Sequence, residues 1–113
     1  MSFIFTARHF KAHDSLKEYA EEESKKFAKI YDGIIKTEVI LSYDKPENSI
    51  KYAEVVVHAK NHHTFTAKES SDDFMKSILA GMEKVAIQIR KFKDKLTDHS
   101  GEISVKHIEA EDQ

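Results

Sequence analysis

The stretch Phe74–Leu96, FMKSILAGMEKVAIQIRKFKDKL, carries the strongest structural pattern in this chain. Its large apolar residues recur at steps of three and four, the repeat of an amphipathic α-helix; they are Phe74, Ile78, Met82, Val85, Ile89, Phe92 and Leu96. Asp72 or Asp73, just before this stretch, can cap its first turn. A long helix with a single apolar stripe needs another layer of structure to cover that stripe.

Two shorter patterns open the chain. Residues Ser2–Arg8 alternate between apolar and polar, which predicts a strand. A helical pattern then begins at His13 or Asp14, with acidic residues in its first half and lysines in its second, a polarity that suits the helix dipole. Gly33 is the expected stop of this helix.

Three further strand patterns lie between the two helices. They cover Ile35–Tyr43, Lys51–Ala59 and Thr64–Lys68, and short turn-like segments separate them. We therefore expect an antiparallel meander. The whole order is β-α-β-β-β-α, and it predicts an α+β fold: a four-stranded sheet with two helices packed on one face. A right-handed crossover through the first helix makes the first two strands parallel.

Composition limits the class of protein. A chain of 113 residues is long enough for one domain, and we expect residues 1–96 to form it, with 97–113 as a flexible acidic tail. The absence of cysteine excludes disulfides, thiolate metal sites and a cysteine nucleophile. Charged residues interrupt the first apolar positions, so neither a signal peptide nor a membrane span is expected, and the predicted location is the cytoplasm.

Charge is distributed unevenly along the chain. The net charge is only −2. Residues 97–113, however, hold five acidic residues against one lysine, whereas Lys76–Leu96 holds six basic residues against two acidic ones. Such asymmetry says more about binding partners than the total charge does. The second helix is therefore the candidate surface for a polyanion.

Basic residues follow defined faces of the predicted helices. At about 100° per residue, Lys84, Gln88, Lys91 and Lys95 fall in one band beside the buried stripe. A row of like charges without acids favours a polyanionic partner such as RNA, although a solvated helix surface explains it too. The full set of candidate RNA-binding residues is Lys84, Gln88, Arg90, Lys91, Lys93 and Lys95 on the second helix and Lys25, Lys26 and Lys29 on the first.

Other chemistry has little support. The histidine pairs His9/His13 and His58/His62, with His63 beside them, fall at strand ends and a turn and not on a helix with further ligands, so we expect no metal. No glycine-rich phosphate loop and no nucleophile-base arrangement is present. We therefore expect neither an enzyme nor a cofactor.

The chain resembles a bacterial family: the short ribosome hibernation-promoting factors and ribosome-associated inhibitors, also called sigma-54 modulation proteins. The likeness is most specific in the second helix and covers about residues 3–96. The matching positions are Asp73, Ile78, Lys84, Gln88, the run KFKDKL at Lys91–Leu96, and, in the first helix, Leu16, Glu18, Tyr19, Lys26, Phe27 and Asp32. The chain departs from the family at Ile87, often arginine, and at Gly81, usually leucine.

The resemblance implies a fold akin to double-stranded RNA-binding domains. It also implies that the basic residues bind ribosomal RNA of the small subunit, block the messenger RNA and transfer RNA sites, and silence ribosomes in starvation or stationary phase. No DNA or membrane partner is implied, and the protein is expected to be a monomer off the ribosome. The acidic tail resembles inhibitor-like short forms, but whether the protein promotes or prevents ribosome dimers stays open.

A second hypothesis comes from a different functional class. The protein is then a protein-interaction module that binds through an exposed sheet edge or through the acidic tail, without binding ribosomes, and the lysine row is merely solvated.

Overall fold

The computed structural model describes residues 2–44 and 50–97. Within these residues the elements run in the order β1 (Ser2–Ala7), α1 (Asp14–Ile30), β2 (Ile34–Tyr43), β3 (Lys51–Ala59), β4 (His63–Ser71) and α2 (Phe74–Thr97). The β-α-β-β-β-α order expected from the sequence is confirmed. The acidic tail lies outside the described residues.

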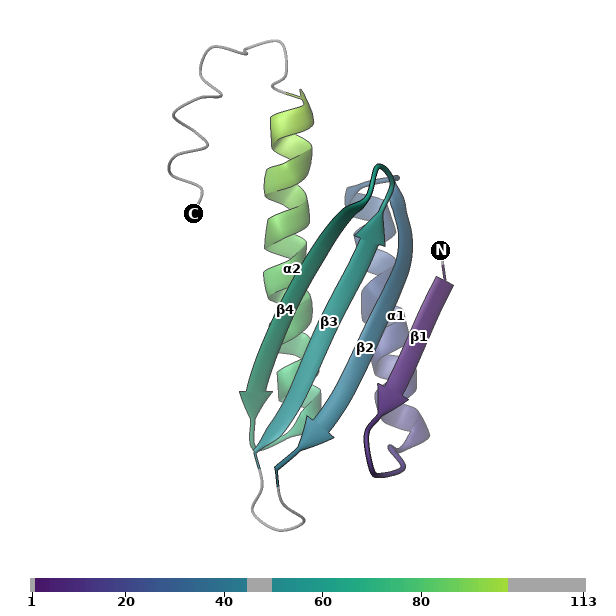
Figure 1. The fold of residues 1–113 in the computed structure, drawn as a ribbon, viewed down its shortest axis with the longest axis vertical. Helices are drawn as coiled ribbons and strands as arrows, with labels where there is room; N and C mark the ends of the chain where they lie inside the picture. Colours follow the sequence, from purple (N-terminus) through teal and green to yellow (C-terminus); the bar gives the residue numbers. More distant parts are fainter. Residues whose placement is uncertain (1, 45–49, 98–113) are drawn as a thin grey trace.

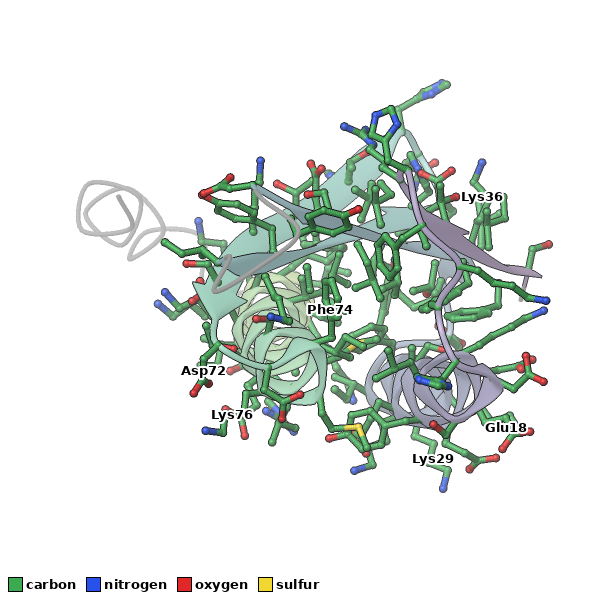
Figure 2. All side chains as sticks on the ribbon, turned by 90° about the horizontal axis from the view of Figure 1, so that it is seen from below. Glu18, Lys29, Lys36, Asp72, Phe74 and Lys76 are labelled. Carbon is green, nitrogen blue, oxygen red and sulfur yellow. The ribbon has the colours of Figure 1, made fainter. Side chains whose placement is uncertain are left out.

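The four strands form one sheet in the order β1-β2-β3-β4. β1 pairs with β2 in parallel, whereas the β2–β3 and β3–β4 pairs are antiparallel, so the expected crossover and meander are both present. Both helices lie on the same side of the sheet (Figures 1 and 2). α2 packs against β3 and β4, and α1 packs beside α2. Among the described residues, no helix is long and apolar enough to cross a membrane.

The core lies between the sheet and the two helices, and α1 contributes Ala20 and Phe27 to it. Val39 and Leu41 of β2, and Val55 and Val57 of β3, are fully buried because alternate residues of each strand face the helices. From α2 they meet the buried part of the predicted stripe, Ile78, Met82, Val85 and Ile89. Leu96 is the exception. It is 48% exposed, because the last turns of α2 extend past the β3–β4 turn and have no sheet beneath them (Figure 1).

The start of α2 is held by a short polar network. Asp73 caps the helix, since its Oδ1 accepts a hydrogen bond from the Met75 N–H at 3.2 Å, while Asp72 pairs with Lys76. The buried Ser77 hydroxyl donates to the Lys51 carbonyl at 2.7 Å and lies 2.8 Å from the Ser71 hydroxyl. These bonds tie the helix to the start of β3 and the end of β4.

Two elements, α1 and β4, have bounds that differ from the expectation. α1 ends at Ile30, before Gly33, and Gly33 has no positive φ, so its assignment as the helix stop is wrong. Gly33 provides space instead, since a Cβ there would lie 2.6 Å from the Tyr31 ring. β4 extends over His63–Ser71, beyond the predicted Thr64–Lys68, because pairing with β3 continues through its polar end.

A glycine also sets the distance between α2 and the sheet. Gly81 is buried, and a Cβ at this position would lie 2.9 Å from Cγ2 of Val55 on β3. Helix and strand can pack this closely only because Gly81 has no side chain.

We predict that Gly81→Leu destabilises the protein, although leucine is the better helix former by somewhat under 1 kcal/mol. Overpacking against Val55 should lower the free energy of unfolding by about 1–3 kcal/mol. Urea unfolding measures this loss. Val55→Ala in the same chain should recover part of it, because the two side chains compete for one space. Equal stability of Gly81→Leu and the original protein would contradict the packing described here.

Candidate nucleic-acid interface

One flank of α2 lies along β4, and we call the band Lys84, Gln88, Lys91 and Lys95 the β4-side row. Two of its members contact β4. Lys84 Nζ lies 3.1 Å from Oε2 of Glu69, and the Gln88 side-chain amide donates a 2.7 Å hydrogen bond to the Thr66 carbonyl. Because Glu69 and Thr66 belong to β4, these contacts fasten the row to the edge of the sheet. The structure thus brings the four predicted residues together on one surface.

Lys91 and Lys95 border a hollow at the far end of this row. Phe65 from β4 and Phe92 from α2 line the hollow together with Gln88, and its volume is about 310 Å³. The two aromatic rings meet edge to face, with centroids 5.5 Å apart, and the His63 ring lies 4.4 Å from Phe92. We call this feature the aromatic hollow. It combines apolar rings with lysines, which suits an anionic partner that also has apolar or planar groups.

The opposite flank of α2 borders a groove against α1. This α1–α2 groove has a volume of about 450 Å³ and carries Arg90 from α2 and Lys26 from α1. Its remaining lining is apolar or acidic: Glu23, Phe27, Ile30, Leu79, Met82, Glu83, Ala86 and Ile87. Ile87, noted in the sequence for its departure from the family, is half exposed at 50%. The groove is thus mixed in charge, unlike the β4-side row.

The lysines of α1 are partly neutralised by their own helix. Lys25 Nζ lies 3.1 Å from a carboxylate oxygen of Glu22, and Lys26 Nζ lies 3.2 Å from one of Glu23. Such exposed pairs add little stability, but they lower the positive potential that a polyanion would meet. Lys29 points away from the sheet (Figure 2).

The predicted basic residues therefore fall on separate surfaces. Only Lys26 and Arg90 meet across the α1–α2 groove, whereas the β4-side row faces the other way. Lys93 is exposed in the last turns of α2 and lines neither hollow. The α1 lysines and the β4-side row do not share a groove.

The histidines that the structure describes do not form a ligand set. His58, His62 and His63 border a hollow of about 440 Å³ at the β3–β4 turn, where Asn61 and His62 both have positive φ, as in a type I′ turn. His58 Nε2 lies 3.5 Å from Glu38. Within residues 2–44 and 50–97, no group of three or more histidine, aspartate or glutamate side chains is placed to hold a metal ion.

Two tyrosines have shifted ionisation. Burial, together with the carboxylates of Glu23 and Glu83, raises the pKa of Tyr19 despite nearby Lys26. The Asp44 carboxylate raises the pKa of Tyr52, whose hydroxyl donates to it at 3.2 Å. A raised pKa keeps both phenols protonated at neutral pH.

Sequence reasoning missed the partners that β4 supplies. Glu69 and the Thr66 carbonyl contact the β4-side row, and Phe65 forms part of the aromatic hollow. The sequence predicted a strand over Thr64–Lys68, so Glu69 lay beyond its expected end, and nothing in the sequence showed which flank of α2 Phe65 would meet. That pairing depends on how the helix crosses the sheet.

Comparison with known proteins identifies relatives of this chain. The family model described as "Sigma 54 modulation protein / S30EA ribosomal protein" matches residues 3–97. No curated protein sequence matches. Among solved structures, a ribosomal subunit interface protein from Coxiella burnetii has a TM-score of 0.74 at 24% identity, covering 84% of this chain and 100% of that one. The N-terminal domain of Protein Y from Thermus thermophilus has a TM-score of 0.71 at 19% identity, covering 81% and 99%. Likeness at these identities shows a shared fold.

We predict a structural role for Gln88, whatever else it binds. Gln88→Ala removes the hydrogen bond to Thr66 and should lower the free energy of unfolding by about 0.5–1 kcal/mol. Lys91→Ala, one turn further along the same flank, serves as the matched control and should change stability by less than about 0.5 kcal/mol. Urea unfolding of both variants measures the difference. If Gln88→Ala costs no more than Lys91→Ala, the bond to β4 does not stabilise the fold.

Proposed function

The chain belongs to the sigma 54 modulation protein / S30EA ribosomal protein family, and from this premise we propose that it is a non-enzymatic ribosome-binding factor. In this proposal it binds ribosomal RNA of the small subunit and blocks the messenger RNA and transfer RNA sites during starvation or stationary phase. The observation that supports it best is the β4-side row with its aromatic hollow. The row lies on α2, the helix in which the resemblance to the family is most specific.

The β4-side row suits the backbone of folded RNA. Its four residues extend over three helical turns, about 16 Å, so they can follow several successive phosphates. Lysine contacts to phosphate add affinity without reading sequence, and recognition then comes from the shape of the RNA. The aromatic hollow between Lys91 and Lys95 gives an unpaired base room to contact the rings.

We place the main contact on the β4-side row and not in the α1–α2 groove. In the groove, Arg90 and Lys26 lie among Glu23 and Glu83, whose carboxylates repel phosphate. Lys25 and Lys26 are also engaged by acids of their own helix. Lys91, by contrast, forms no ion pair within the described part of the chain. Lys25, Lys26 and Lys29, with Arg90 and Lys93, make a secondary group.

We predict that Lys91→Glu with Lys95→Glu abolishes co-sedimentation with small ribosomal subunits on sucrose gradients. Two phosphate contacts are lost and two repulsive charges gained. For the original protein, affinity should fall with salt, each phosphate contact adding roughly 0.7–0.9 to the log–log slope. The variant's thermal unfolding should stay close to that of the original protein, because both side chains lie at the surface.

Two further double variants with the same change in charge complete the design. Lys26→Glu with Arg90→Glu alters the α1–α2 groove and should weaken binding less. Lys17→Glu with Lys68→Glu alters exposed residues elsewhere, on α1 and β4, and should leave binding almost unchanged. Full ribosome binding by the Lys91/Lys95 variant would overturn the assignment of the site. Transfer RNA bound together with messenger RNA should displace the original protein from ribosomes if the protein and transfer RNA occupy the same place.

One observation favours the alternative of a protein-interaction module. β1 lies at the edge of the sheet, pairs only with β2, and carries no charged residue within Ser2–Ala7. An open, uncharged edge can accept a strand from a partner. Binding to a protein that survives high salt, with no protein in any ribosomal fraction at low salt, would support this alternative and contradict ribosome binding.

A further inference from the structure

The aromatic hollow lies close to the point where the described chain ends. Phe92, Lys91 and Lys95 belong to the last two turns of α2, and the helix ends at Thr97. Residues 98–113 follow directly. The segment therefore begins within one helical turn of Lys95 along the chain.

The chemistry of residues 98–113 complements the hollow. The segment has five acidic residues, Asp98, Glu102, Glu109, Glu111 and Asp112, against the single Lys106. Between them, Ile103 and Val105 alternate with polar residues, so an extended chain presents both apolar side chains on one face. The hollow offers what this pattern needs: the rings of Phe65 and Phe92, bordered by Lys91 and Lys95.

The segment is also long enough. Ile103 is the sixth residue after Thr97, and an extended chain covers about 3.3–3.6 Å per residue, so six steps span about 20 Å. The β4-side row measures about 16 Å along the helix. After reversing direction at the end of α2, the segment can thus reach the hollow and run beside the row.

We propose that residues 98–113 fold back onto the aromatic hollow and the β4-side row and act as an intramolecular competitor of RNA. Ile103 and Val105 contact Phe65 and Phe92, and the acidic residues pair with Lys91 and Lys95. The α1–α2 groove does not suit the segment, because Glu23 and Glu83 would repel it. The contact between residues 98–113 and the hollow does not depend on the proposed function. Competition with ribosomal RNA does rest on the proposed function.

Weak contacts are sufficient for such a competitor. A tethered segment is present at an effective concentration in the millimolar range, so it need not bind tightly to occupy its site. A ribosome with many phosphates still displaces it, whereas shorter or weaker polyanions do not. The tail would then raise the threshold for binding and favour extended, folded RNA over incidental RNA.

Paramagnetic relaxation tests the contact directly. The chain has no cysteine, so Ser104→Cys introduces a single site for a nitroxide label while Ile103 and Val105 stay in place. At low salt, the label should broaden the amide signals of Phe65, Gln88 and Lys91 and leave those of β1 unchanged. Raising the salt concentration should weaken the broadening, because the proposed pairs are ionic. The same labelled chain with Glu102→Gln, Glu109→Gln and Glu111→Gln should show much weaker broadening.

Affinity for ribosomes tests the consequence. The three tail substitutions, without the label, should tighten binding roughly three- to tenfold, as expected for the loss of two or three surface ion pairs. The matched control is Glu18→Gln, Glu21→Gln and Asp32→Asn, which removes three exposed charges from α1 and the turn after it, none of them paired with a candidate RNA-binding lysine, and should change affinity much less.

The outcomes separate the two proposals. Broadening around the hollow without any ribosome binding supports the tail contact and contradicts the proposed function. Ribosome binding without broadening, or broadening centred on Ile30 and Ile87 of the α1–α2 groove, overturns the tail contact. Broadening at the hollow with unchanged affinity in the tail variant overturns its role as a competitor.

Discussion

The apolar stripe of α2 packs against the inner face of β3 and β4, and the direction of every charged residue on that helix follows from this contact. Gly81 lies directly over Val55, so the helix sits close to the sheet. Asp73 and Ser77 then hold its first turn against the ends of β3 and β4. With the stripe buried, one flank must run along β4 and the other must face α1.

This orientation gives the two flanks different electrostatic surroundings. Along β4, Lys84 pairs with Glu69, and Lys91 and Lys95 border an aromatic hollow. Toward α1, Arg90 lies among acids of both helices. The basic residues on the two flanks therefore differ in the positive electrostatic potential that a partner meets. The reason is that a nearby carboxylate cancels much of the field of a surface lysine or arginine. For this reason we propose the β4-side row, and not the α1–α2 groove, as the main surface for a polyanion.

The order of elements, the parallel first pair of strands and the buried stripe were all predictable from the sequence. They depend on periodicity and on connection lengths, which are local properties. Two predictions failed because of neighbouring structure: the sheet ends before the last turns of α2, and the Tyr31 ring lies close to Gly33. Leu96 continues the stripe but is exposed beyond the sheet, and Gly33 makes room for Tyr31 where a helix stop was expected.

The candidate site also has features that the sequence could predict and features that only the fold could show. That Lys84, Gln88, Lys91 and Lys95 share one band follows from helical geometry alone, so the sequence was sufficient to group them. Their partners on β4, the closure of Phe65 with Phe92 into a hollow, and the separation of the row from the α1 lysines required the folded structure. The physical reason is that a helix's own repeat sets which residues are neighbours on it, while the crossing of helix and sheet sets what those neighbours face.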